Sequence, residues 1–106
     1  MSSPLDTTIR VGEIRAAEPF EEARKPELLK LEIDLGDAVV RSAAQLGYNH
    51  DPDGIVGRQV LCATDLGTVN IAGFESEALT LGVPDADDHP MLVGPDRDVP
   101  LGGELY

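Results

Sequence analysis

Apolar and charged residues alternate most regularly over residues 29–35. Every second residue there is apolar and the residues between are charged, with Leu29, Leu31, Ile33 and Leu35 set against Lys30, Glu32 and Asp34. A period of two places alternate side chains on opposite faces, so this segment is predicted to be a β-strand with one buried face. Gly36 and Asp37 end the strand, and residues 38–43 are expected to return beside it as a hairpin.

Three further segments carry strand signals. They cover residues 9–18, 58–65 and 77–83, and a helical turn is expected between residues 51 and 57. The period of two also predicts which side chains share a face: Ile9, Val11 and Glu13 in the first segment, and Val60, Cys62 and Thr64 in the second. The segment of residues 19–23 is too short for an independent helix and is expected to form a helical turn or loop.

Five short strands with turn residues between them and little helix favour an all-β fold closed into a small barrel. Two architectures fit this pattern, a five-stranded OB-fold and an SH3-like barrel. A length of 106 residues fits one domain. We take that domain to span residues 1–106, with the barrel over about residues 9–84 and a C-terminal extension over about residues 85–106.

The chain is strongly acidic, with 20 Asp and Glu residues against 8 Lys and Arg residues and a net charge of −12. The acids are spread along the whole chain, which indicates a global adaptation rather than an acidic tail. We interpret it as adaptation to a salt-rich cytoplasm, since the Debye length falls to ~3 Å at about 1 M salt. No apolar run approaches the ~18 residues that cross a bilayer, and no signal peptide is evident. A cytoplasmic protein without membrane insertion is therefore expected.

Catalytic, cofactor and metal chemistry find no support in the sequence. It contains no phosphate-cradling glycine loop, nucleophile elbow or dinucleotide fingerprint. The acidic run Asp85-Ala-Asp-Asp-His89 fails the calcium-loop pattern because Pro90 stands where a glycine is needed. His50 and His89 have no second ligand at zinc spacing, and Cys62 is expected to be a small buried hydrophobe. We therefore expect no enzyme, no cofactor and no metal.

Five motifs follow one another in an order that resembles the small tRNA-binding-domain family, most closely its CsaA-type branch. They are Glu22-Ala-Arg-Lys-Pro26, Ser42-Ala-Ala-Gln45, Gly57-Arg-Gln-Val60, Ile71-Ala-Gly-Phe-Glu-Ser-Glu77 and Pro95-Asp-Arg-Asp-Val-Pro100. The resemblance covers about residues 9–103 and implies a non-catalytic OB barrel that binds tRNA. Because members of this branch are also described as export-related chaperones, binding of unfolded or export-destined polypeptides is the alternative function. A scaffold that has kept the fold and lost RNA binding is a third hypothesis.

The resemblance also implies a homodimer built from the chain ends. Its interface is expected to include Leu5, Leu92, Val99 and Leu101. The alternative is that the C-terminal segment simply covers one end of the barrel.

Basic and polar side chains around the second and third predicted strands are the candidate RNA contacts, because those strands carry the binding platform of OB-folds. The candidates are Arg24, Lys25, Lys30, Arg41, Ser42, Gln45, Asn70 and Ser76. The alternative is ordinary ion pairing with Glu27, Glu32 or Asp34 for the basic residues, and turn hydrogen bonding for the polar ones.

Three departures from the family pattern weaken an RNA site. The loop Gly67-Thr-Val-Asn70 carries no charge where members often have basic residues, and Glu75 stands where they often have Lys. Ala43 replaces a serine of the family motif.

The salt hypothesis predicts that the melting temperature rises between low salt and molar potassium chloride, because screening weakens repulsion among the carboxylates. Thermal unfolding followed by circular dichroism measures it. Sodium chloride at equal ionic strength should give a similar rise, and a melting temperature that stays constant or falls would contradict the hypothesis.

Overall fold

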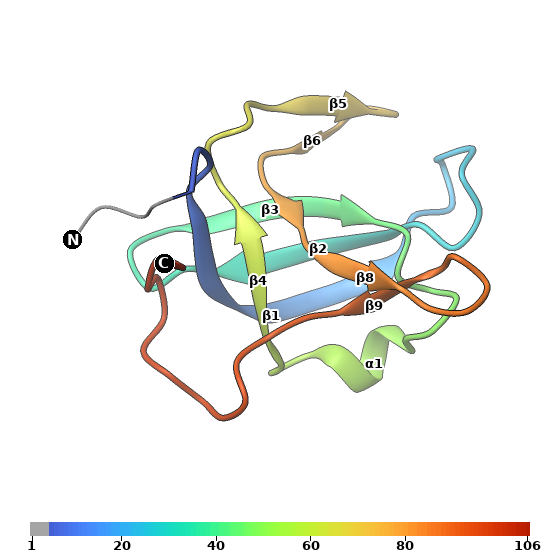
Figure 1. Cartoon of the computed structure of the whole chain (residues 1–106). Coiled ribbons are helices and arrows are strands. Elements are labelled where there is room, and N and C mark those ends of the chain that lie inside the picture. Colours follow the sequence, from blue (N-terminus) through green and yellow to red (C-terminus); the bar gives the residue numbers. More distant parts are fainter. Residues whose placement is uncertain (1–4) are drawn as a thin grey trace.

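Five antiparallel strands form the main sheet of the computed structural model, which describes residues 5–106. They are β1 (Ile9–Pro19), β2 (Leu29–Asp34), β3 (Val39–Ala44), β4 (Gln59–Ala63) and β7 (Leu79–Thr80), in the order β3-β2-β1-β4-β7. Two hairpins are added to this sheet, β5 (Val69–Ile71) with β6 (Phe74–Ser76), and β8 (Gly82–Pro84) with β9 (Pro90–Leu92). The short helix α1 (Pro52–Ile55) lies across the barrel from β5 and β6 (Figure 1).

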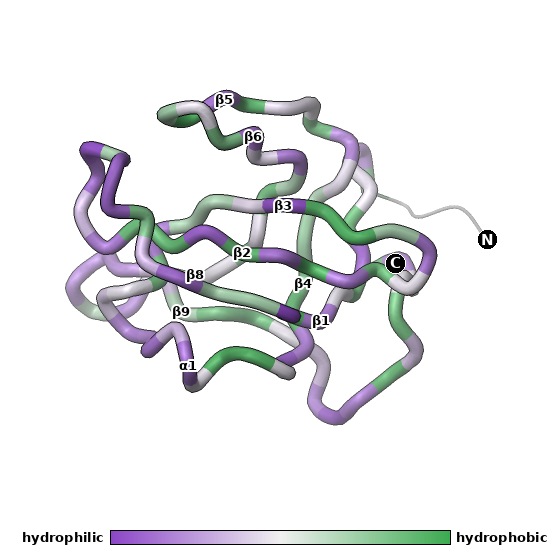
Figure 2. Tube along the Cα trace, turned by 180° about the vertical axis from the view of Figure 1, so that it is seen from behind, coloured by the Kyte–Doolittle hydropathy of each residue, from purple (hydrophilic) through white to green (hydrophobic). Residues whose placement is uncertain are grey.

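The prediction of a five-stranded OB barrel is confirmed. The alternation on β2 is also confirmed, since Leu29, Leu31 and Ile33 are buried while Glu32 between them is exposed. Figure 2 shows the polar residues interrupting the apolar ones along this strand. The last predicted strand is divided in two, because β7 ends at Thr80 and β8 begins at Gly82.

Ile9, Val11 and Glu13 alternate along β1 as the period of two predicts, but their face is only partly buried. The buried residues on β1 are Gly12 and Ile14, whereas Val11 and Glu13 are only partly buried. Gly12 faces Ile33 so closely that a Cβ at this position would collide with the isoleucine side chain. The inward position therefore carries no apolar side chain, and the hydrophobic pattern could not reveal it.

A β-bulge lets β1 serve both halves of the barrel. The register between β1 and β2 shifts between Ile14 and Ala16, leaving Arg15 as the extra residue. The guanidinium of Arg15 lies 2.7 Å from a carboxylate oxygen of Asp34, and this hydrogen bond lowers the pKa of the Asp34 carboxyl. Bulges bend the strand that carries them. The first half of β1 consequently pairs with β4 and the second half with β2.

The barrel closes along a seam where residues 41–43 of β3 face residues 76–80. No regular ladder crosses this seam in the described chain, and polar bonds join its sides instead. The Glu77 N–H donates to the Arg41 carbonyl at 2.7 Å, and the Arg41 N–H donates to the Glu77 carboxylate at 3.0 Å. Beneath them, the hydroxyls of Ser42 and Thr80 are 2.8 Å apart. The five strands thus form a nearly closed barrel.

The C-terminal segment occupies the edge of β1 that β2 leaves free. The Val11 N–H donates to the Gly103 carbonyl at 2.9 Å, and the Leu105 N–H donates to the Ile9 carbonyl at 2.7 Å. Earlier in the same segment, the Gln59 side chain donates to the Val99 carbonyl at 2.8 Å and accepts from the Val99 N–H at 3.0 Å. These bonds satisfy backbone groups that would otherwise form an open strand edge.

Aliphatic residues from both halves of the barrel build the core. They are Ile14, Leu29, Leu31, Ile33, Leu35, Leu46, Ile55, Val60, Cys62, Ala78 and Leu92. Cys62 is fully buried as expected, and burial raises the pKa of its thiol to about 11. No helix within residues 5–106 is long and apolar enough to cross a membrane.

Three consecutive side chains hold the β8–β9 hairpin against the end of β3. Tyr48 stacks on His89 with ring centroids 3.8 Å apart, and Asn49 donates to the Asp85 carboxylate at 2.9 Å. The Nε2 atom of His50 accepts a hydrogen bond from the Leu92 N–H at 3.2 Å. An acceptor at Nε2 requires the neutral imidazole, so this contact depends on pH.

We predict that stability falls when His50 becomes protonated. Burial lowers the pKa of His50 in the folded protein, so the unfolded chain binds the proton first. The contribution of His50 to the free energy of unfolding should therefore be fully present above about pH 6.5, the pKa of an unperturbed histidine. It should decline as the pH falls through the pKa of His50 in the folded protein. Urea unfolding between pH 7.5 and 5 measures it. His50→Gln keeps a neutral acceptor and should remove this part of the pH dependence; an unchanged pH profile in the variant would contradict the assignment.

Candidate functional site

Two loops converge beside β2 and β3. The loop of residues 20–28 joins the first two strands of the barrel, and the loop of residues 64–78 joins the last two and contains the β5–β6 hairpin. Following OB-fold usage we call them L12 and L45. They meet where the rings of Phe20 and Phe74 pack edge to face, with centroids 5.5 Å apart. In OB-folds these loops and the β2–β3 face bind oligonucleotides and oligosaccharides. We call this surface the L12–L45 face.

The β5–β6 hairpin turns tightly at Ala72 and Gly73. Both residues have positive φ angles, 48° and 83°, as a two-residue hairpin turn of the I′ type requires. The Asn70 side chain accepts a hydrogen bond from the Gly73 N–H at 3.2 Å and stabilises the turn. The turn places Phe74 on the strand that faces β3.

Two of the predicted RNA-binding cations lie close to the ring of Phe74. The Lys30 ammonium lies 6.0 Å from the centroid of Phe74 and 5.1 Å from that of Phe20. The Arg41 guanidinium lies 5.3 Å from the Phe74 centroid. Such contacts attract a cation to the ring face, with about 0.5–1 kcal/mol at exposed sites. Phe20 is buried, so its ring offers no open face as a stacking platform for bases, whereas Phe74 is half-buried.

Lys30 and Arg41 are also paired with carboxylates. Lys30 lies 3.1 Å from Glu18, and Arg41 lies 3.7 Å from Glu77 and 4.0 Å from Glu75. The sequence alternative of ion pairing therefore holds for these two, although with partners other than Glu27, Glu32 and Asp34.

Arg24 and Lys25 differ from the other two cations. Both are exposed on L12, and neither forms an ion pair with any carboxylate in residues 5–106. The four predicted cations thus fall into two pairs on the L12–L45 face. Lys30 and Arg41 line one depression together with Glu18 and Phe74, whereas Arg24 and Lys25 line a neighbouring recess that also involves L12.

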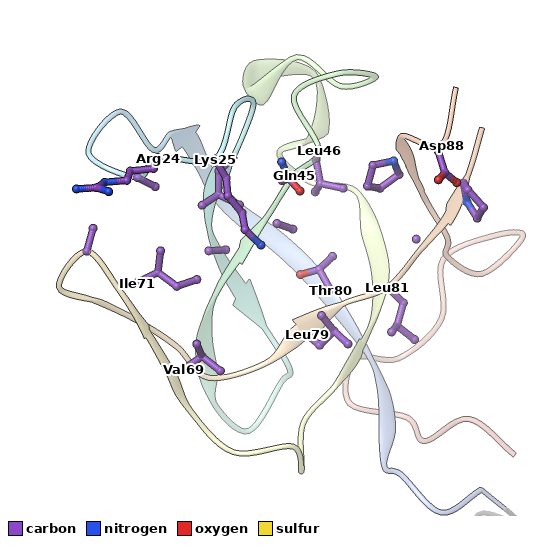
Figure 3. A pocket seen from close by; sticks show the side chains of 18 of the residues that line it. Arg24, Lys25, Gln45, Leu46, Val69, Ile71, Leu79, Thr80, Leu81 and Asp88 are labelled. Atoms are coloured by element: carbon purple, nitrogen blue, oxygen red, sulfur yellow. The ribbon is translucent and has the colours of Figure 1, made fainter. Parts of the chain in front are cut away.

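A recess of about 920 Å³ opens between the two loops (Figure 3). Arg24 and Lys25 lie on its L12 side and Gln45 lies at the end of β3. Apolar side chains from L45, β7 and the segment after it line much of the rest, among them Val69, Ile71, Leu79, Leu81 and Val83. The recess combines apolar walls with a rim of mixed charge, because Glu22 and Asp88 line it together with Arg24 and Lys25.

The remaining polar candidates have mainly structural contacts. Gln45 donates to the Pro26 carbonyl at 3.0 Å and joins β3 to L12 while facing the recess. Ser42 is fully buried against Thr80, and Ser76 is buried with its hydroxyl bonded to the Ala43 N–H at 3.1 Å. Both serine hydroxyls lie inside the seam, where a ligand on the surface does not reach them. The alternation pattern could not show this, because the seam forms only in the closed barrel.

The residues expected at a dimer interface lie in different environments. Leu92 belongs to the core, because its side chain packs inside its own barrel with an exposed fraction of 7%. Val99 is exposed and Leu101 is half-buried. Leu5 is exposed at the start of the described chain.

Sequence reasoning missed Glu18 and Glu77 as parts of the site. Glu77 ends the motif that begins at Ile71, so its place in the motif was the available signal. Within residues 5–106, no three His, Cys, Asp or Glu side chains gather closely enough to hold a metal ion.

The barrel and its loop face define an OB-fold domain of the oligonucleotide-binding type. The chain belongs to the family described as putative tRNA binding domain, whose model matches residues 9–104. This confirms the family indicated by the sequence motifs.

Individual relatives fall into two groups. The chain is 37% identical over 101 residues to a methionine–tRNA ligase of Methanococcoides burtonii, a match that covers 94% of this chain and 14% of the ligase. It therefore spans about one seventh of that relative. Among solved structures it resembles the chaperone CsaA of Bacillus anthracis, with a TM-score of 0.86, 31% identity and coverage of 100% of this chain and 99% of that one. The CsaA chaperone protein of Picrophilus torridus also gives a TM-score of 0.86, at 33% identity and 95% and 92% coverage.

Proposed function

We propose that this protein is a non-catalytic, cytoplasmic tRNA-binding module and that it contacts RNA through the L12–L45 face. The observation that carries the proposal is the pair Arg24 and Lys25, two exposed cations on the ligand-binding side of an OB barrel that form no ion pair with a carboxylate of residues 5–106. The family match over residues 9–104 supports tRNA as the nucleic acid. Gln45 and Asn70 border the same loops and are proposed as polar contacts.

The acidic surface requires that binding be local. Phosphate neutralisation supplies much of the affinity for RNA, and each contact contributes about 0.7–0.9 to the slope of log K against log salt. With a net charge of −12 the protein repels RNA at long range. The free cations on L12 offset this repulsion only over the surface near them. We therefore expect modest affinity that depends on few residues.

The proposal predicts that tRNA binding depends on Arg24 and Lys25. Arg24→Ala with Lys25→Ala should weaken tRNA binding about 30-fold at 0.1 M salt and reduce the salt slope by about 1.4–1.8, because two phosphate contacts are lost. Fluorescence anisotropy with labelled total tRNA over 0.05–0.5 M potassium chloride measures both quantities.

The matched control removes two positive charges elsewhere. Arg58 and Arg97 lie around a separate depression that is lined in part by residues 92–98. The variant Arg58→Ala with Arg97→Ala has the same net charge as the variant at Arg24 and Lys25. This control should bind tRNA within about threefold of the wild type. Equal loss in both variants would mean that only net charge matters and would refute the L12–L45 face as the site.

The apolar recess favours a second candidate function, the holding of unfolded polypeptide segments. Its walls include the exposed side chains of Val69 and Leu79. Salts that are excluded from the protein surface strengthen apolar contacts rather than weaken them. Two solved relatives are described as chaperones. This function requires no net positive charge, which suits the acidic surface.

If the recess holds polypeptides, Val69→Asp with Leu79→Asp should abolish suppression of client aggregation at stoichiometric protein, because two carboxylates would enter the apolar walls. Light scattering of thermally unfolded citrate synthase measures it. Val39→Asp with Val56→Asp changes two equally exposed valines outside the recess and should retain the activity. Suppression that is absent in the wild type, or equal in both variants, counts against this function.

We also propose that the C-terminal segment contributes to a homodimer. The support is the exposure of Val99, Leu105 and Tyr106, three apolar or aromatic side chains on a segment whose backbone is fixed against the barrel. Leu5 and Leu101 are the other candidates retained from the sequence, whereas Leu92 fills the core. Sedimentation equilibrium should give twice the chain mass at about 50 μM, and Val99→Asp should give the monomer. A monomeric wild type at that concentration would reject the dimer.

A further inference from the structure

Half of the cations on the L12–L45 face already hold an anion that belongs to the protein. A Glu18 carboxylate oxygen lies 3.1 Å from the Lys30 ammonium, and a Glu75 oxygen lies 4.0 Å from the Arg41 guanidinium. Both glutamate side chains are well exposed, at 66% and 59%. They occupy solvent-facing positions beside the cations, which are the positions that a phosphate group from an RNA strand would take.

The aromatic rings fix these cations from the other side. Lys30 lies over Phe20 and Phe74, and Arg41 lies over Phe74. Cation–π contacts do not depend on the glutamates, so both cations keep their positions when the carboxylates move away. Exposed ion pairs are weak, and exchange of one oxyanion for another around a fixed cation is therefore accessible.

Glu77 has a different role from Glu75 although both approach Arg41. Its carboxylate accepts the Arg41 backbone N–H at 3.0 Å and its own N–H donates to the Arg41 carbonyl at 2.7 Å. Glu77 therefore belongs to the seam that closes the barrel. Within residues 5–106, the carboxylates of Glu18 and Glu75 contact only the two cations, and neither accepts a backbone N–H.

We infer that Glu18 and Glu75 are internal competitors of phosphate, which keep Lys30 and Arg41 from RNA until the strand displaces them. This inference rests on the proposed tRNA-binding function and specifies its regulation. Arg24 and Lys25 make the first phosphate contacts. Lys30 and Arg41 make phosphate contacts only where the RNA backbone continues across β2 and β3. Weakly or briefly bound RNA therefore does not contact them. The two glutamates thereby make binding depend on an extended phosphate surface rather than on isolated anions.

The test removes the competitors without changing their shape. Glu18→Gln with Glu75→Gln should bind tRNA about tenfold more tightly than the wild type at 0.1 M salt. Its salt slope should be steeper by about 0.7–1.8, because one or two further phosphate contacts form. The matched control, Asp98→Asn with Glu104→Gln, changes the net charge by the same amount on the C-terminal segment and should stay within about threefold of the wild type.

A second measurement follows the exchange itself. The Nη resonances of Arg41 report on the nitrogen that faces Glu75. They should shift when Glu75→Gln removes the carboxylate, and they should shift on addition of tRNA in both the wild type and this variant. Melting temperatures of all variants establish that each is folded before binding is compared.

The outcomes separate the inference from the function on which it rests. Wild-type binding that depends on Arg24 and Lys25, with equal affinities in the double glutamine variant and its control, would overturn the inference and leave the function intact. Absence of tRNA binding in the wild type and in every variant would reject both. Tighter binding with a steeper salt slope in the double glutamine variant alone supports the competitor role.

Discussion

The pair of hydrogen bonds between Arg41 and Glu77 connects the fold of this protein to its surface chemistry. One bond joins the Glu77 N–H to the Arg41 carbonyl and the other joins the Arg41 N–H to the Glu77 carboxylate, and together they close the gap between β3 and L45, where the described chain has no regular strand ladder. The side chains of the two residues bring a carboxylate to 3.7 Å from the guanidinium. Closure of the barrel along this seam thus places the Glu77 carboxylate next to Arg41.

The L12–L45 face is divided as a result. On the β2–β3 side, cations are held between aromatic rings and glutamates, and on the L12 side they are not paired. A chain with 20 acidic residues cannot rely on long-range attraction to bring RNA to its surface. A few unpaired cations beside an apolar recess instead give short-range contacts that remain at high ionic strength, where only neighbouring charges interact. This arrangement accommodates both a phosphate backbone and an apolar polypeptide, which are the two ligands proposed above.

Some elements were predictable because their signal is local. The strict alternation of β2 determines a strand with one buried face wherever it is placed, and the burial of Cys62 follows from its apolar strand. The inward face of β1 was not predictable. One of its positions is Gly12, which has no side chain and therefore adds nothing to the hydrophobic pattern. The burial of Ser42 and Ser76 depends on hydrogen bonds to residues 38 and 33 positions away, which no local pattern encodes.

The sequence by itself determined the strand content, the family and the set of basic residues available for binding, since these depend on residue order and composition alone. The tertiary structure decided which basic residues remain free. Ion pairing depends on distances of about 4 Å between side chains. The pairing of β1 with β2 brings Glu18 to Lys30, and barrel closure brings Glu75 and Glu77 to Arg41, while Arg24 and Lys25 lie on a loop. Because those distances are set by strand register and packing, composition could count the charges but could not assign their partners.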